Sequence, residues 1–398
     1  MSSPSQIKDN LVFTCKHEQF PETSVDSDKL FKYARWLEKN NQLRQEEAIY
    51  AQIERLYRIA LESGHYKANI NLQNGALRGH YQLGREEHLR MSQQLIDAEV
   101  ATGHFFIGYF LQRAVALKND PEMALRYYRK AADEGNAEAQ YYIAEKLAPS
   151  DIAPDIARQM HRCAAEQGHG KAAVALGVNL KGLGQYQDAL KIFQLGVAAG
   201  HESAASRLSA AFRDPKPNNI IHYLGQQKDD ERADRYKKIW RILANYSYAN
   251  PKVPEINEIV PLPPAKLPPW DGKLQWLEER LANVPPPKPS ETLIGELAKA
   301  KRLDPATGKP MPGAAGFNQS HLLPLNSSAH SGEACPVSGY WKINWHYMPK
   351  SVWSEEVVRY FEQGQIMPTH NVKHRYPRPW PFTDKIIRRE QAVRWMLA

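Results

Sequence analysis

Small and apolar residues recur at helical spacing along the first half of the chain. The clearest case is ALRYYRKAADEGNAEAQYYIAEKLA, residues 124–148, where Ala124, Tyr128 and Ala131 fall on one helix face at i, i+4 and i+7. Gly135 interrupts this pattern in the middle. Glycine ends helices because it adopts the left-handed backbone conformation without strain. The segment therefore predicts two helices joined by a glycine-centred turn.

The same pattern occurs five times in all when the chain is aligned on one glycine. The aligned glycines, separated by 39, 32, 33 and 32 residues, are Gly64, Gly103, Gly135, Gly168 and Gly200. Four residues after them stand Ala68, Ile107, Ala139, Ala172 and Ala204. Seven residues before them stand Tyr57, Ile96, Tyr128, His161 and Phe193. Alanine lets helix backbones approach closely, and one helix pair cannot bury its apolar face alone, so we expect the pairs to stack into an α-solenoid.

A polar residue follows each aligned glycine. These residues are His65, His104, Asn136, His169 and His201. Successive copies lie about one repeat apart and point the same way, which does not suit a shared metal ion. We expect each side chain to cap its own turn, and we expect no metal site in this column.

Proline marks the end of the repeats. The segment DDERADRYKKIWRILANYSYAN, residues 229–250, predicts one more helix that caps the stack, and eleven of the 28 prolines then fall between residues 251 and 289. Proline fixes φ and donates no backbone hydrogen bond, so this stretch is predicted to run extended. Leucines at helical spacing indicate one short helix at residues 274–281. Two tryptophans in the stretch favour a strap packed on the solenoid over a free linker.

The remaining residues predict a small α+β module. Ser290 and Glu291 mark the start of a helix. Alternating side chains over residues 340–345 predict a strand. The segment SVWSEEVVRYFEQGQIMP, residues 351–368, is interpreted as a helix that begins at a serine cap and stops at Gly364.

These patterns together predict a mainly α protein with four parts. An extended N-terminal arm covers residues 1–25, the solenoid residues 26–248, the proline-rich strap residues 249–289, and the α+β module residues 290–398. A chain of 398 residues is too long for one compact core, which agrees with a division into several units.

Charge and cysteine content constrain the function weakly. The formal net charge of +8 permits an acidic partner, a nucleic acid or an anionic lipid surface, but requires none of them. Cys163 lies within a repeat helix and is interpreted as a buried free thiol, while a disulfide between Cys15 and Cys335 would need an oxidising compartment. No apolar run reaches the roughly 18 residues of a membrane-spanning helix. The first ten residues are polar and show no secretory signal.

Several common catalytic and cofactor-binding motifs are missing from the sequence. It contains no GxSxG nucleophile elbow, phosphate loop, HExxH zinc motif or GxGxxG in a strand–helix context. Cys335, His346, His370 and His374 could be drawn together as a zinc site, but no two of them show the spacing of a zinc finger. We therefore expect no catalytic residue, no cofactor and no metal.

The tail instead concentrates the residue types that anchor protein interfaces. The candidate protein-binding residues are Tyr340, Trp345, Trp353, Arg375, Arg378 and Trp380. Trp341 and Trp345 fall on the same face of the predicted strand, so we expect these two side chains to lie in the core of the module.

The repeat resembles the Sel1-like repeat family, relatives of the tetratricopeptide arrays, over about residues 26–214. The blocks AADEGNAEAQYYIAEKLA and CAAEQGHGKAAVALGVNL carry this resemblance. Together with the proline-rich strap and the tail motifs CPVSGYW and RYFEQGQIMP, the chain resembles the immunity proteins that are paired with type VI secretion effectors, especially those directed against phospholipase D-type toxins.

The resemblance implies a Sel1/tetratricopeptide-like solenoid whose concave surface holds another protein. It implies a non-catalytic protein that binds and neutralises a cognate phospholipase effector, without nucleic acid and without stable membrane insertion. It also implies the periplasm, with the cytoplasm as the fallback because no targeting segment is visible. Two alternatives are an adaptor that holds an effector without inhibiting it and a nucleic-acid binder with a basic tail.

Overall fold

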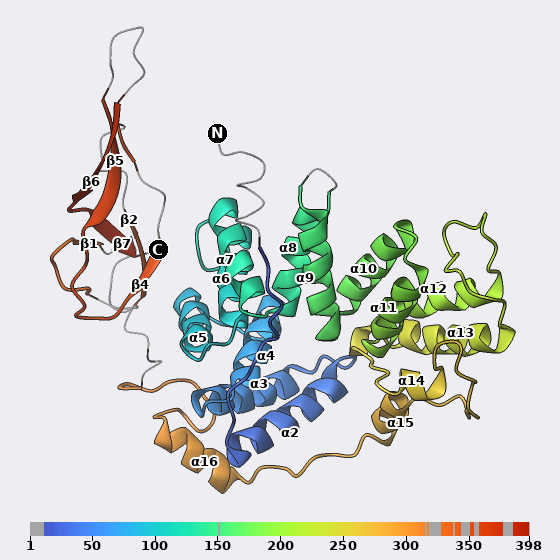
Figure 1. Ribbon diagram of the computed structural model, residues 1–398. Coiled ribbons are helices and arrows are strands. Elements are labelled where there is room, and N and C mark those ends of the chain that lie inside the picture. The colour runs from blue at the N-terminus through green and yellow to red at the C-terminus, as the bar shows by residue number, and fades with distance from the viewer. Residues whose placement is uncertain are drawn as a thin grey trace.

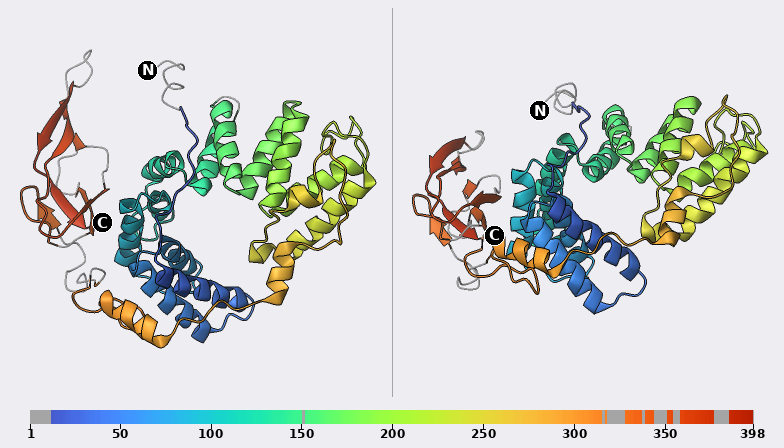
Figure 2. Two further views of the ribbon diagram at one scale, coloured as in Figure 1. Left: turned by 60° about the horizontal axis from the view of Figure 1, so that its bottom comes forward. Right: turned by 90° about the horizontal axis from the view of Figure 1, so that it is seen from below.

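The computed structural model of the protein describes residues 12–149, 152–314, 317, 328–336, 339–343, 351–353, 358–376 and 385–397. Most of them form a curved stack of helices, and strands follow at the C-terminal end (Figures 1 and 2). This arrangement confirms the predicted fold class, a solenoid followed by a strap and a C-terminal region with strands. None of the helices in the described ranges is both long enough and apolar enough to cross a membrane.

Five helix pairs form the stack within the described residues. In chain order they are α3 (Glu47–Glu62) with α4 (Tyr66–Leu77), α5 (Arg85–Asp97) with α6 (Thr102–Arg113), α7 (Pro121–Asp133) with α8 (Ala137–Leu147), α9 (Pro154–Glu166) with α10 (Gly170–Gly182), and α11 (Tyr186–Ala198) with α12 (Glu202–Arg213). Helix α2 (Val25–Asn41) packs on α3 at the start, and α13 (Asp230–Asn245) packs on α12 at the end. The helix predicted to cap the array is therefore present.

The turn within each pair, which we call a corner, is closed by the predicted glycine in four of the five pairs. Gly64, Gly135, Gly168 and Gly200 all have positive φ. At the first corner the Gly64 N–H donates to Leu61 O at 2.9 Å, and the next N–H donates to Ala60 O at 3.0 Å. These two bonds satisfy carbonyls that the end of the helix leaves free.

The second corner differs from the prediction. Gly103 lies inside α6, and Glu99 closes the corner with a φ of 57°. The Glu99 and Val100 N–H groups make the same backward bonds as at the other corners, to Ile96 O and Leu95 O. Gly103 therefore stands four residues after its corner, in the place of Ala68. A Cβ on Gly103 would lie 2.7 Å from Ser92 O of α5, so glycine is needed here for close helix approach.

The alanine column and the polar caps behave largely as predicted. Ala68, Ala139, Ala172 and Ala204 are fully buried between helices. His65, Asn136 and His169 each begin the second helix of a pair, and each side chain accepts a hydrogen bond from the backbone N–H three residues later. His201 makes no such bond, and His104 lies within α6 because of the shifted corner.

The proline-rich strap packs on the end of the solenoid. It contains the 3-10 turn η1 (Ser247–Ala249) and two short helices, α14 (Ile256–Ile259) and α15 (Gln275–Ala282). Its apolar residues Val253, Ile256, Val260 and Leu274 are buried in the same core as α11, α12 and α13. The prediction of a packed strap is therefore confirmed, and α14 is an additional helix.

The C-terminal region contains a helix and two small antiparallel sheets. Helix α16 (Glu291–Ala300) starts at Ser290, whose side chain accepts from the Leu293 N–H as predicted, and it packs on α3. The strands are β1 (Ser328–His330), β2 (Gly339–Ile343), β3 (Val352–Trp353), β4 (Val358–Phe361), β5 (His370–Tyr376), β6 (Lys385–Gln391) and β7 (Arg394–Leu397). Their orders are β1-β7-β2-β4 and β3-β5-β6.

The prediction of a helix over residues 351–368 is wrong, because the described part of this segment contains strands β3 and β4. β4 pairs with β2, and the chain then turns at Gly364, which has positive φ. Val358 and Tyr360 point toward the solenoid core, whereas Phe361 joins the core of the strands and contacts Trp395. A segment with apolar residues on both of its faces suits a strand covered on both sides.

Candidate protein-binding surface

The N-terminal arm, residues 12–24, runs in extended form across several corners of the solenoid. Phe13 is buried among the residues of α5–α9, and Arg129 of α7 donates to Val12 O at 2.8 Å. Further along, the Lys67 ammonium of α4 lies 5.1 Å from the centre of the Phe20 ring. The arm therefore covers a surface to which successive helix pairs contribute (Figure 2).

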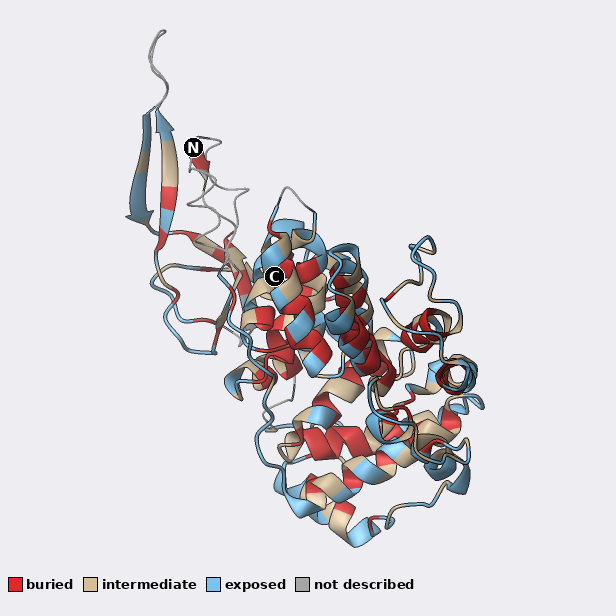
Figure 3. Ribbon diagram, turned by 45° about the vertical axis from the view of Figure 1, so that its right-hand side comes forward, coloured by how far each residue is buried: buried red, intermediate tan, exposed pale blue. Residues whose placement is uncertain are grey.

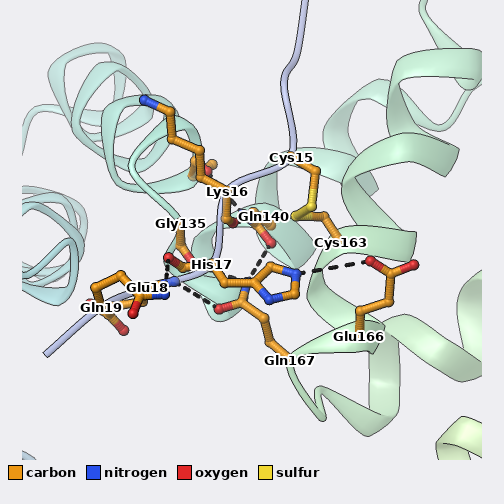
Figure 4. A network of polar contacts seen from close by, with 11 residues as sticks. Cys15, Lys16, His17, Glu18, Gln19, Gly135, Gln140, Cys163, Glu166 and Gln167 are labelled. Atoms are coloured by element: carbon orange, nitrogen blue, oxygen red, sulfur yellow. Dashed lines mark hydrogen bonds and ion pairs between the residues drawn. A yellow bond between two sulfur atoms is a disulfide. The ribbon is translucent and has the colours of Figure 1, made fainter.

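Two glutamines from neighbouring pairs hold the arm backbone (Figure 4). Gln140 of α8 donates to Lys16 O at 2.9 Å. The Gln167 side chain accepts from the Glu18 N–H at 3.0 Å and donates to both Gly135 O and Gln140 Oε1. These two glutamines thus hold the arm through its main chain.

Gly135 leaves room for the arm. A Cβ at this position would lie 2.6 Å from backbone atoms of His17 and Glu18. At Gly168 an added Cβ would meet no atom within 4 Å. Both corner glycines have positive φ, but of the two only Gly135 would bring an added Cβ against a bound segment.

The Glu18 carboxylate enters a polar site between two corners. It accepts from the Thr102 hydroxyl at 2.7 Å and from the Thr102 N–H at the start of α6, and Asn136 donates to it at 3.5 Å. Burial raises the pKa of Glu18 above its ordinary value, although the donors from Thr102 and Asn136 act in the opposite direction. This side chain fixes the register of the arm on the solenoid.

A disulfide between Cys15 and Cys163 ties the arm to α9, with the two Cα atoms 5.6 Å apart. This pairing corrects the interpretation of Cys163 as a free thiol, and it answers the open question of whether Cys15 pairs with Cys335, which it does not. Cys335 is instead buried in the core of the C-terminal strands. His17 lies close to both bonded sulfurs, but the disulfide engages them and leaves no thiolate to bind a metal.

The strap backbone lies against the glycine of the last corner, Gly200, as the arm backbone lies against Gly135. A Cβ on Gly200 would lie 1.8 Å from Pro251 O. The neighbouring Lys252 ammonium donates to Ala199 O at 3.0 Å, and burial lowers the pKa of Lys252. Two of the corners are therefore covered by segments of the protein itself, while the corner at Gly168 between them has free space above the glycine.

Two arginines of α13 bind carbonyl groups of the strap. Arg232 donates to Pro261 O and Ala265 O, and Arg235 donates to Ile259 O and Pro268 O. Because proline cannot donate hydrogen bonds, a proline-rich segment forms few internal ones, and many of its carbonyls need outside donors. The arginines supply these donors and hold the strap in place.

The end of α15 reaches back to the first helix. The Asn283 amide donates to Asn40 Oδ1 of α2 at 2.7 Å, and Trp36 of α2 donates to Asn283 O at 3.4 Å. The Arg280 guanidinium lies against the rings of Tyr248 and Trp276 and donates to Gln42. We call this set of contacts between α15 and α2 the clasp. It joins the two ends of the curved stack (Figure 2).

The candidate protein-binding residues are dispersed over the C-terminal region. Tyr340 is on β2, Trp353 is on β3, and Arg375 is an exposed residue of β5. Trp345, Arg378 and Trp380 lie outside the described residues. Trp341 is fully buried in the module core, as predicted. The residues that hold the arm and strap were missed, and the sequence signal for them is weak: single glutamines and arginines in otherwise regular repeat helices.

The zinc site considered from the sequence, with Cys335, His346, His370 and His374 as ligands, is not seen among the described residues. His370 is buried against Trp395, and the His374 ring bonds to Gln391 at 3.0 Å. His346 lies outside the described residues. His370 and His374 are therefore engaged with other side chains of the strands.

Comparison with protein families gives one match. The model of DUF6396, a domain of unknown function, matches residues 204–311, which run from α12 through the strap and α16. No curated protein matches the chain.

Solved structures give a more informative comparison. PA5087 and PA5088 of Pseudomonas aeruginosa, both named as immunity proteins, are each 25% identical to this chain, with TM-scores of 0.50 and 0.52. The matches cover 64% and 63% of this chain and 95% and 94% of those proteins. PA5086 of the same organism is 27% identical with a TM-score of 0.49, over 63% of this chain and 95% of its own. With its stacked helix pairs and the left-handed backbone conformation at their corners, the chain has the Sel1-like repeat fold and resembles these immunity proteins.

Proposed function

We propose that this protein is a non-catalytic immunity protein that binds and neutralises an antibacterial phospholipase effector of a type VI secretion system. The observation that carries the proposal is the similarity of fold to two immunity proteins over nearly their whole length. Neutralisation needs no chemistry from this chain, because a tightly bound protein that covers the entrance to the lipase site excludes the lipid.

The solenoid supports this role through the way it binds extended chains. The arm and the strap lie over the corners at Gly135 and Gly200, so a partner in this region meets the space above Gly168 and the outer surfaces of the arm and strap. Exposed parts of the C-terminal strands add a second surface. A partner held by both would bury more area than either surface offers alone.

The test is to mix the purified protein with a phospholipase D-type effector of the same bacterium. We expect the two proteins to elute together in gel filtration, and hydrolysis of phospholipid vesicles to fall at least about tenfold at equal molar amounts. Unchanged elution and unchanged hydrolysis would rule out the proposal. A stable complex with full lipase activity would identify a loading adaptor instead.

We further propose that the protein works in the periplasm. The Cys15–Cys163 disulfide supports this location, because such bonds persist in the bacterial periplasm and are rare in the cytosol. Non-reducing electrophoresis of protein trapped with a thiol-alkylating reagent in intact cells should show the oxidised form. Recovery of only the reduced form, in the cytosolic fraction, would contradict this location.

A further inference from the structure

Strands β5 and β6 form a two-stranded ribbon, defined as residues 370–376 and 385–391, that extends away from the solenoid (Figure 3). β6 is at the edge of the sheet β3-β5-β6, and no described strand pairs with its outer side. An edge strand offers a row of backbone N–H and C=O groups to another extended chain. Five of the seven residues of β6 are exposed.

The ribbon is strongly basic. Its cations are Lys373, Arg375, Lys385, Arg388 and Arg389, whereas its only carboxylate is Glu390, which accepts a hydrogen bond from Thr369. Arg388 and Arg389 are adjacent on β6, and both are exposed. An acidic chain along the edge of β6 would therefore meet two neighbouring positive charges.

Exposed apolar side chains lie among these cations. Ile386 is 57% exposed and sits opposite Arg375, and Tyr376 is 39% exposed and sits opposite Lys385. Arginine, tyrosine and aliphatic side chains in one surface are typical of protein interfaces. The ribbon therefore matches a polypeptide better than it matches a nucleic acid or a lipid surface, since neither of those would pair with the free backbone of β6.

We propose that an acidic extended segment of the effector pairs with the outer edge of β6 and adds a fourth strand to the sheet β3-β5-β6. This inference deepens the proposed function by naming the chemistry of the partner. Consecutive side chains of a strand alternate between faces, so Arg388 points to one face and Arg389 to the other. The segment should therefore carry two adjacent acidic residues, one for each arginine.

The test uses the full chain and a synthetic peptide that alternates valine with glutamate and has one Glu–Glu pair at its centre. The same peptide with lysine in place of glutamate, a DNA duplex and phosphatidylglycerol vesicles are the comparison probes. The variant is Arg388→Glu with Arg389→Glu. Its matched control is Arg113→Glu with Lys118→Glu, which makes the same change of charge at exposed solenoid positions.

We expect the acidic peptide to bind, to slow amide hydrogen exchange over residues 385–391, and to dissociate as salt is raised. The β6 variant should bind at least about tenfold more weakly, and the solenoid control should bind as the native protein does. Equal binding of the lysine peptide, equal binding by the β6 variant, unprotected β6 amides, or binding of only the DNA or the vesicles would each overturn the inference.

A second arm separates this inference from the proposed function. The rate of effector association should fall at least about tenfold in the β6 variant, while its thermal unfolding stays unchanged. If the native protein binds the acidic peptide through β6 but neither binds nor inhibits the effector, the proposed function fails and the acidic-strand site stands. If the effector binds native protein and β6 variant equally fast, only the inference fails.

Discussion

The corner glycines show how one residue type meets two different requirements. Gly135 and Gly168 both have positive φ, +114° and +82°, so alanine at either position suffers backbone strain. Only Gly135 also faces a bound segment, because the arm backbone lies where its Cβ would be. The pair therefore separates the effect of backbone conformation from that of arm binding.

We expect Gly168→Ala to lower the free energy of unfolding by about 1 to 2 kcal/mol, the cost of a left-handed alanine. Gly135→Ala should cost about 1 to 3 kcal/mol more, because displacing the arm also breaks the hydrogen bonds to Lys16 and Glu18. Urea unfolding measures both variants, and limited proteolysis measures release of the arm. Equal losses in the two variants, with the arm still protected, would contradict this account.

Buried histidines make the solenoid sensitive to acid. His88 of α5 is buried against Phe110 and bonds to Gln73, and burial lowers the pKa of His88 to about 4. In the unfolded chain the same histidine has its ordinary pKa of about 6.5. Between these two pKa values the unfolded state binds more protons than the folded state. The stabilisation that comes from keeping His88 neutral is therefore fully present above pH 6.5 and is lost as the pH falls toward 4.

Replacing this titrating group should therefore flatten the pH dependence. From pH 7 to pH 5 the free energy of unfolding of the native protein should fall by about 2 kcal/mol because of His88. In His88→Phe the fall over the same interval should be smaller by about 2 kcal/mol. Urea unfolding at the two pH values gives the comparison. An identical loss in both proteins would show that His88 does not titrate on unfolding.

At the scale of elements, the arm is the segment whose position depends most on a covalent bond. The disulfide joins residues that are 148 positions apart, and cross-links that close long loops limit the unfolded chain most. Cys15→Ser should lower the free energy of unfolding by about 2 to 5 kcal/mol and expose residues 12–24 to protease. Addition of dithiothreitol should destabilise the native protein similarly and leave the variant unchanged. A reductant-sensitive variant would mean that the effect arises elsewhere.

How much of each element the sequence could predict depends on how local its cause is. The corners at Gly64, Gly135, Gly168 and Gly200 follow from glycine in a helical pattern, which is a local property. The corner at Glu99 was missed because a glycine four residues later offered a plausible alignment, although that glycine serves helix packing. Non-local packing decided the conformation, and the local pattern could not reveal it.

The C-terminal strands and the arm show the same limit. The serine and glycine around residues 351–364 are compatible with a helix, but β4 is fixed by pairing with β2 and by contacts on both of its faces. The partner of Cys15 depends on where the arm lies on the solenoid. Gln140 donates to the arm backbone and Gln167 accepts from it, and no spacing along the chain encodes these contacts.

At the scale of the whole molecule, the solenoid is closed by its own extensions. A solenoid of this kind is stabilised mainly between neighbouring units, so its ends are free to move apart. Here residues 283–290 run from α15 to α16, which packs on α3, and the clasp joins α15 to α2 (Figure 1). We therefore expect the strap to fix the curvature of the surface that a partner would meet.

The clasp can be tested through its asparagine pair. Asn40→Ala and Asn283→Ala each remove the same contact between α2 and α15, so their effects on unfolding should be non-additive, with a coupling of about 1 kcal/mol. Each variant should also increase the radius of gyration in small-angle scattering, because the ends of the solenoid separate. Leu281→Ala, at a neighbouring residue that is 65% exposed, is the control and should leave the radius unchanged. Additive losses with an unchanged radius would mean that the curvature is set by the helix pairs alone, and that the clasp only follows it.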